Sequence, residues 1–71
     1  MMKRIKKIDE IKPDRFYHAV VFTQFGVLTS AVLAGFDMKE RMKKAKYEKE
    51  YDLFFFPGDA SGYDIFEQED Y

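Results

Sequence analysis

The chain has 71 residues, which is enough for one small domain, and we expect residues 1–71 to form it. It contains no Cys and one His, which excludes disulfides, Cys-type zinc sites and His-rich metal sites. Aromatic side chains make up 18% of the residues, too many for a disordered chain. Charged residues between positions 9 and 15 interrupt any apolar leader segment, so we expect a cytoplasmic protein. The sequence contains no dinucleotide or phosphate-loop motif, and we expect no cofactor.

Charge is distributed unevenly along the chain. Residues 1–51 carry twelve basic and seven acidic side chains, whereas residues 52–71 carry six acidic side chains and no basic ones. The net charge of -1 therefore hides a basic part and an acidic end. Such asymmetry indicates either charged partners or an acidic end that folds against the basic part.

The N-terminal half predicts a short arm followed by a hairpin. Isoleucines recur every three residues among charged side chains in residues 1–13, which is typical of a short, basic, helical arm. Aromatic and β-branched residues then predict two strands, over Arg15–Phe25 and Val27–Ala34. Gly26 separates them, which favours an antiparallel hairpin.

The remaining residues predict one helix and two further strands. Asp37 lies three residues before Glu40, an arrangement typical of a capping box, and predicts a helix over Met38–Glu50. Asp52–Phe56 and Tyr63–Phe66 read as strands. The expected fold is therefore an α+β domain. It has a small antiparallel or mixed sheet in the order β-β-α-β-β, one helix packed on a face, a core over residues 14–66, and an acidic tail over residues 67–71.

The expected strands are apolar on both faces. Val20–Phe22, Ala31–Ala34 and Phe54–Phe56 do not alternate with polar residues. A helix of 13 residues is about 20 Å long and covers one face, so apolar surface is left for a homodimer or for another protein. In the alternative, the arm and the C-terminal aromatics Tyr63 and Phe66 fill the gap.

One segment also allows a membrane interpretation. Residues 16–36 contain no Asp, Glu, Lys or Arg and are long enough to span a bilayer as a helix. Gln24 lies near the centre of this run, where an unpaired amide is costly, and the run is rich in β-branched residues. A small single-span membrane protein is therefore kept as an alternative.

No residue pattern points to catalysis or to a metal. His18 is the one side chain with an ordinary pKa near neutrality, and as a lone His among apolar neighbours it fits a core or rim position. Ser30 and Ser61 lie outside any nucleophile motif. Residues 59–70 resemble a calcium loop only faintly, because the required Gly is displaced and the bidentate Glu is absent.

Two charged segments could contact a partner. The basic segment 38–50 offers lysines to phosphates, and a nucleic-acid-binding protein is one alternative. The acidic end, residues 59–71, is called here the acidic-aromatic strip. It interleaves carboxylates with aromatic anchors: Asp59, Asp64, Glu67, Glu69 and Asp70 with Tyr63, Phe66 and Tyr71. Such a strip could enter a groove that normally holds phosphates.

These observations favour a small, non-enzymatic protein-binding module. We expect an inhibitor or modulator that occludes a surface of its partner, for example a nucleic-acid-handling protein. The expected contact residues belong to the third strand and the acidic-aromatic strip: Phe54, Phe55, Phe56, Asp59, Tyr63, Asp64, Phe66, Glu67, Glu69, Asp70 and Tyr71.

Overall fold

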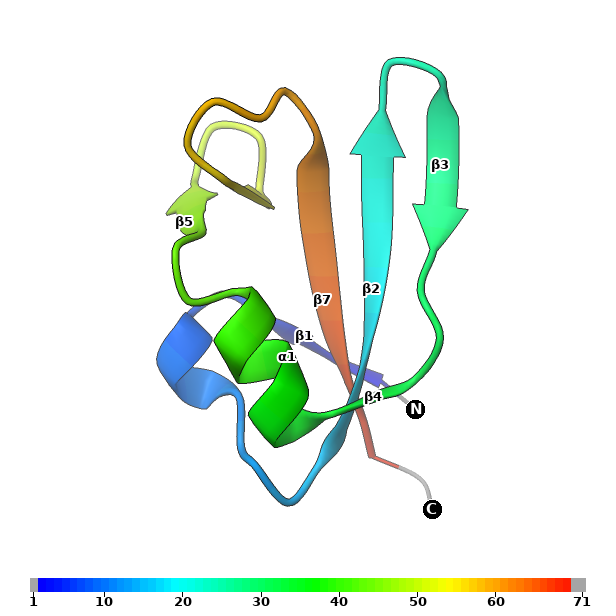
Figure 1. The fold of residues 1–71 in the computed structure, drawn as a ribbon, viewed down its shortest axis with the longest axis vertical. Coiled ribbons are helices and arrows are strands. Elements are labelled where there is room, and N and C mark those ends of the chain that lie inside the picture. Colours follow the sequence, from blue (N-terminus) through cyan, green and yellow to red (C-terminus); the bar gives the residue numbers. More distant parts are fainter. Residues whose placement is uncertain (1, 70–71) are drawn as a thin grey trace.

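The computed structural model describes residues 2–69 and folds them into a bent antiparallel sheet with a short helix on one side (Figure 1). The helical elements are the 3₁₀ turn η1 (Ile8–Glu10) and the helix α1 (Gly35–Arg41). The strands are β1 (Met2–Ile5), β2 (Phe16–Thr23), β3 (Gly26–Thr29), β4 (Leu33–Ala34), β5 (Lys46–Glu48), β6 (Leu53–Phe55) and β7 (Gly62–Gln68).

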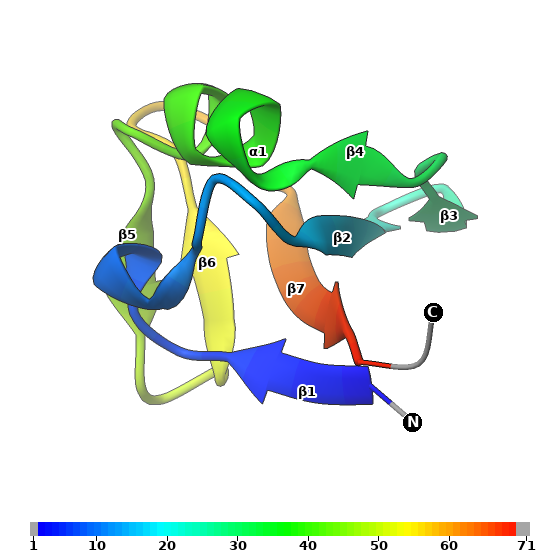
Figure 2. The same cartoon turned by 90° about the horizontal axis from the view of Figure 1, so that it is seen from below.

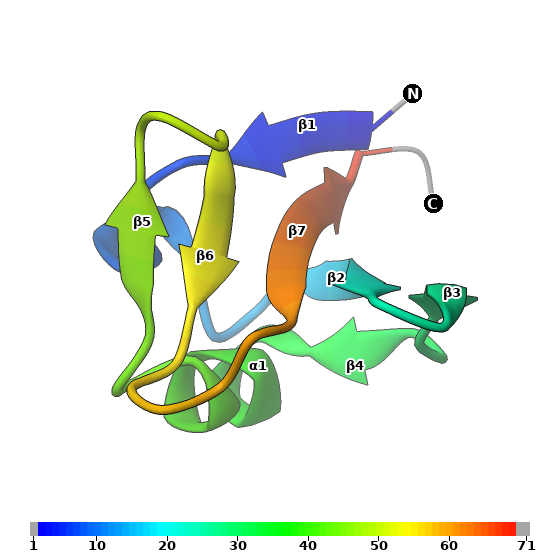
Figure 3. The same cartoon turned by 90° about the horizontal axis from the view of Figure 1, so that it is seen from above.

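β7 organises the sheet because it has a different set of neighbours on each edge. On one edge it pairs with β2 over its whole length, from Gly62 opposite Phe22 to Gln68 opposite Phe16. On the other edge, β6 pairs with the first two residues of β7 and β1 pairs with the last four. Figures 2 and 3 show the resulting bend, in which β1 runs across the direction of β5 and β6.

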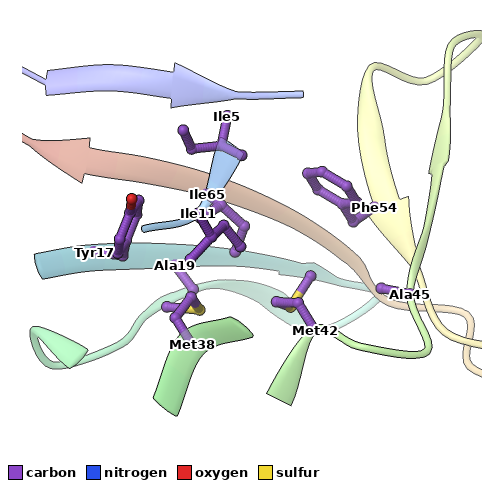
Figure 4. Packing of buried hydrophobic residues seen from close by; sticks show 9 residues of the cluster. All are labelled: Ile5, Ile11, Tyr17, Ala19, Met38, Met42, Ala45, Phe54 and Ile65. Atoms are coloured by element: carbon purple, nitrogen blue, oxygen red, sulfur yellow. The ribbon is translucent and has the colours of Figure 1, made fainter. Parts of the chain in front are cut away.

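The core lies on the inner side of this bend (Figure 4). Tyr17 of β2 and Ile65 of β7 are fully buried there, and Met38 and Met42 reach them from the helical side. The other buried hydrophobic residues of this cluster are Ile5, Ile11, Ala19, Ala45 and Phe54. The core therefore sits under α1 and η1 and does not extend along the whole of β2.

The expected helical arm is wrong. Residues 2–5 form a strand, and Ile5 pairs with Ile65 in the sheet, so that only one 3₁₀ turn remains of the helix. As a strand, residues 2–5 pair with four residues on the free edge of β7, and Ile5 becomes buried. An isolated helical turn is marginally stable and would provide neither the pairing nor the burial. The Glu10 carboxylate accepts hydrogen bonds from the backbone N–H groups of Lys6 and Lys7 and holds the turn.

The long helix over Met38–Glu50 is wrong as well, and so is the β-β-α-β-β order. The helix starts at Gly35 without a side-chain cap and ends at Arg41. Gly35 is required at this start because a Cβ would lie 1.6 Å from the carbonyl oxygen of Lys12. The chain then extends into β5, where Tyr47 packs against Phe54 of β6, and this tertiary contact outweighs the local helix propensity.

The uncharged run 16–36 is mostly strand, which removes the basis for a spanning helix. It forms β2, β3, β4 and the first residues of α1. Ser30 interrupts the second expected strand, because its Oγ accepts from the N–H of Ala19 at 2.9 Å and donates to the carbonyl of Ala31 at 2.9 Å. Within residues 2–69, no helix is long and apolar enough to cross a membrane.

Candidate protein-interaction surface

β7 divides the acidic-aromatic strip between two faces of the sheet. Successive side chains of a strand point to opposite faces, and Ile65 points into the core. Tyr63 and Glu67 therefore share the inner face, whereas Asp64 and Phe66 lie on the outer face. The strip does not form one continuous surface in this fold.

Glu67 is a buried structural residue, only 8% exposed. Its carboxylate accepts a hydrogen bond from the Tyr17 hydroxyl at 2.9 Å, and this hydroxyl accepts one from the backbone N–H of Lys12 at 2.7 Å. The chain of bonds ties β7, β2 and the segment before β2 together. Glu69 is exposed, and the expected contact residues Asp70 and Tyr71 lie outside the described residues.

Asp64 is also held within the fold. Arg4 of β1 donates from Nε to Asp64 Oδ1 at 2.7 Å and from Nη1 to Asp52 Oδ2. The other carboxylate oxygen of Asp52, Oδ1, accepts a hydrogen bond from the hydroxyl of Tyr47. The hydrogen bond to Asp64 is the main reason that the pKa of Arg4 lies above its ordinary value. This network joins β1 to β7 and to the turn between β5 and β6, so it stabilises the bend.

The three consecutive phenylalanines pack within the protein to different degrees. Phe54 is 2% exposed and belongs to the core. Phe55 makes an edge-to-face contact with Tyr51, with ring centroids 5.6 Å apart, and Phe56 makes one with Tyr63 at 5.1 Å. Phe55 and Phe56 are half-buried, so this run offers less free surface than its sequence suggests.

A different set of apolar side chains is left uncovered, on the hairpin of β2 and β3. This hairpin extends past the end of α1, as Figure 1 shows. Phe22, Phe25, Val27 and Leu28 are 39%, 91%, 59% and 63% exposed. We call residues 20–29 the apolar finger.

Both faces of the apolar finger carry exposed hydrophobic groups. Val27 pairs with Phe22, so both lie on the outer face, and Leu28 pairs with Val21 on the opposite face. Phe25 stands at the tip between the two strands. The finger therefore presents apolar groups in three directions, and residues 16–36 contain no charged side chain to interrupt them.

The tip of the finger is locally fixed. Thr23 Oγ1 accepts from the N–H of Phe25 at 3.1 Å and donates to the carbonyl of Gly26 at 2.9 Å. Gly26 has a φ of 142°, which side-chain-bearing residues rarely adopt. Phe25 is thus held on an ordered turn rather than on a loose loop.

A groove runs beside the tip. Its walls are residues 23–28 of the finger and residues 59–61 of the loop before β7, and its volume is about 530 Å³. Asp59 orders this loop by accepting from the N–H of Ser61 at 2.9 Å and from the hydroxyl of Tyr63 at 3.2 Å. Partial burial is the main reason that the pKa of Tyr63 lies above its ordinary value of 10.0, and the charge of Asp59 adds to it.

β3 leaves one backbone edge open. It pairs with β2, and within residues 2–69 no strand pairs with its other side. The backbone N–H of Ser30 donates to the carbonyl of Ala19 at 2.8 Å, so the backbone groups of Ser30 point toward β2. Antiparallel pairing alternates, and the backbone groups of Leu28 therefore also face β2 while those of Val27 and Thr29 point to the open edge.

The basic segment 38–50 does not form the helix on which the nucleic-acid alternative depends. Its lysines are spread over α1, the turn after it, β5 and the following turn. His18 lies on the outer face and its Nε2 is 3.1 Å from Oε1 of Gln68. In the described part of the chain, no group of three or more His, Asp or Glu side chains is placed to hold a metal ion.

Comparisons with known proteins give no match, neither to a protein-family model, nor to a curated protein, nor to a solved structure. From the sequence, Val20–Phe22 and Ala31–Ala34 were expected to be apolar on both faces, but the contact was assigned to Phe54–Phe56 and the acidic-aromatic strip, so Phe25, Val27 and Leu28 were missed. The signal that marks the finger is the absence of charge from the whole run 16–36, which the sequence indicates as a hairpin of two strands or, in the alternative, as a membrane span.

Proposed function

We propose that this chain is a non-enzymatic protein-binding module and that the apolar finger is its contact surface. The observation that carries the proposal is the exposure of Phe22, Phe25, Val27 and Leu28 on one uncharged hairpin. Exposed apolar patches of several hundred Å² on small proteins mark interaction sites, and aromatic anchors such as Phe25 contribute strongly to binding.

The shape of the finger supports action by occlusion. An ordered, projecting hairpin with hydrophobic groups in three directions can fill an apolar cleft and exclude whatever else would bind there. The module would then inhibit or modulate its partner without chemistry of its own. The cytoplasmic setting and the lack of a cofactor, both expected from the sequence, belong to the same proposal.

The charge of the finger constrains the partner surface. No Asp, Glu, Lys or Arg lies between residues 16 and 36, so the partner does not need a complementary charge at the centre of the contact. Asp59, at the wall of the groove beside the tip, is the carboxylate of the acidic-aromatic strip placed to meet the rim of such a partner. The contact is therefore apolar at its centre and acidic at one margin.

The test is capture of proteins from an extract of the native cell by the immobilised chain. The double variant Phe25→Ser, Leu28→Ser is compared with the control Phe36→Ser, which changes an aromatic residue of α1 that is 68% exposed. We expect the finger variant to lose its specific captures by about tenfold or more, and the control to keep them. Equal capture by wild type and finger variant, with unchanged circular dichroism, would contradict the proposal.

A further inference from the structure

We propose that the first occupant of the apolar finger is a second copy of this chain, joined by antiparallel pairing of the two β3 strands. This inference rests on the proposed function, because it names a partner for the same finger. It starts from the open edge of β3, to which Val27 and Thr29 turn their backbone groups.

The register of the contact follows from which residues face the edge. In a two-fold arrangement centred on Leu28, Val27 lies opposite Thr29 of the second copy, and Thr29 opposite Val27 of the second copy. Each of these pairs exchanges two N–H···O=C bonds, because both of its members have outward-facing backbone groups. Leu28 then lies opposite Leu28 of the second copy, at a position where the two Cα atoms are about 4.5 Å apart.

The side chains of two such copies match. The two Leu28 side chains, exposed in the single chain, contact each other across the axis. The same register carries Phe25 at the tip toward the segment after β3 of the second copy, where Val32 is also exposed. Pairing therefore brings uncovered hydrophobic groups of one copy onto those of the other.

Charge favours a second copy over a charged partner. Residues 16–36 carry no ionisable Asp, Glu, Lys or Arg, so the self-contact buries no unpaired charge, and the net charge of -1 gives little repulsion between copies. Natural edge strands are often protected by Lys, Pro or a bulge, and Gly26–Thr29 has neither of these residues. An unprotected, uncharged edge is complementary to itself.

The size of the contact sets its strength. The proposed register covers Leu28 and Phe25, which are 63% and 91% exposed, and leaves Phe22, one strand in from the edge, uncovered. The area that two copies bury therefore stays below the roughly 1,200 Å² at which stable specific interfaces begin. We expect a reversible dimer with a dissociation constant in the micromolar range, which another protein that binds the finger would have to displace.

Sedimentation velocity of the purified chain from about 5 to about 500 µM tests this inference. Wild type is expected to shift from monomer to dimer over that range. Thr29→Pro removes an outward-facing N–H in each copy and is expected to weaken the dimer about 30-fold, whereas the matched control Thr29→Val keeps the N–H and the dimer.

A charge exchange at the axis provides a second test that does not depend on proline. Leu28→Lys and Leu28→Glu each place like charges opposite one another and are expected to be monomeric. An equimolar mixture of the two is expected to form a heterodimer, because the axis then joins Lys to Glu. Amide spectra of each variant check that the fold is kept, and Leu28 is exposed enough to tolerate both changes.

The outcomes separate this inference from the proposed function. A wild-type chain that stays monomeric at the highest concentration, or a mixture that does not associate, would overturn self-pairing. The proposed function stands in that case if capture from extract still depends on Phe25 and Leu28. Loss of both self-pairing and finger-dependent capture would overturn the two together.

Discussion

The two halves of β2 are both mainly apolar but differ in how far their inner face is covered. On the inner face, Tyr17 and Ala19 of the first half lie in the core with Met38 of α1. Val21 of the second half is only half-buried, and its cross-strand neighbour Leu28 is 63% exposed. The two halves differ in cover rather than in hydrophobicity: α1 has seven residues and is about 10 Å long, so it ends before the hairpin does. An apolar strand is thus buried only as far as another element reaches over it.

The largest difference between the covered core and the uncovered apolar finger is expected from truncating one aromatic residue in each. Phe54→Ala removes a core side chain and is expected to cost about 3–5 kcal/mol of unfolding free energy, a large part of the roughly 4–10 kcal/mol available to a domain of this size. Phe25→Ala, at the exposed tip, is expected to change it by about 0.5 kcal/mol or less. Urea unfolding at low protein concentration measures both, and equal losses would show that the finger is part of the core.

A smaller effect is expected from the hydroxyl of Tyr17. Tyr17→Phe leaves the buried Glu67 without its donor and the N–H of Lys12 without its acceptor, and should cost about 1–3 kcal/mol. Tyr51→Phe, at an exposed ring, is the matched control and should be nearly neutral. Urea unfolding measures both variants. An unchanged free energy of unfolding in Tyr17→Phe would mean that this buried chain of hydrogen bonds does not stabilise the fold.

The smallest effect is expected at high pH, beside the groove. The pKa of Tyr63 is raised in the folded state, chiefly by burial, so the folded state favours the neutral phenol. The stability that this provides is fully present below the unfolded pKa of about 10 and is lost as the pH rises through the folded value. The free energy of unfolding of wild type should therefore fall more steeply from about pH 9 to about pH 12 than that of Tyr63→Phe. Parallel curves would contradict the burial of this ring.

Local sequence patterns predicted strands that depend on nearby residues. The aromatic and β-branched run after Arg15 forms β2, and the apolar run ended by Pro57 contains β6. Elements that depend on distant residues were missed. Residues 2–5 become a strand because β7 offers an edge some 60 residues later, and the helix ends at Arg41 because Tyr47 packs on Phe54.

The sequence predicted that apolar surface would stay exposed, but it did not predict which residues form that surface. The excess of apolar residues over what one helix can cover was visible in the sequence, and the structure leaves such residues exposed. Their position depends on where α1 ends, which no local pattern shows. The alternation in β7 was readable, because Glu67 follows Ile65 by two residues and so shares its buried face.

Amide hydrogen exchange at Val27 and Thr29 reports on whether the apolar finger is covered when the chain meets a partner. The ¹⁵N-labelled chain would be compared dilute, concentrated, and dilute in an extract of the native cell. We expect exchange at these two outward-facing amides to slow by about tenfold or more in the concentrated sample or in the extract, while that of Leu28, bonded to β2, stays unchanged. Equal exchange of Val27 and Thr29 under all three conditions would contradict the assignment of the finger as a binding surface.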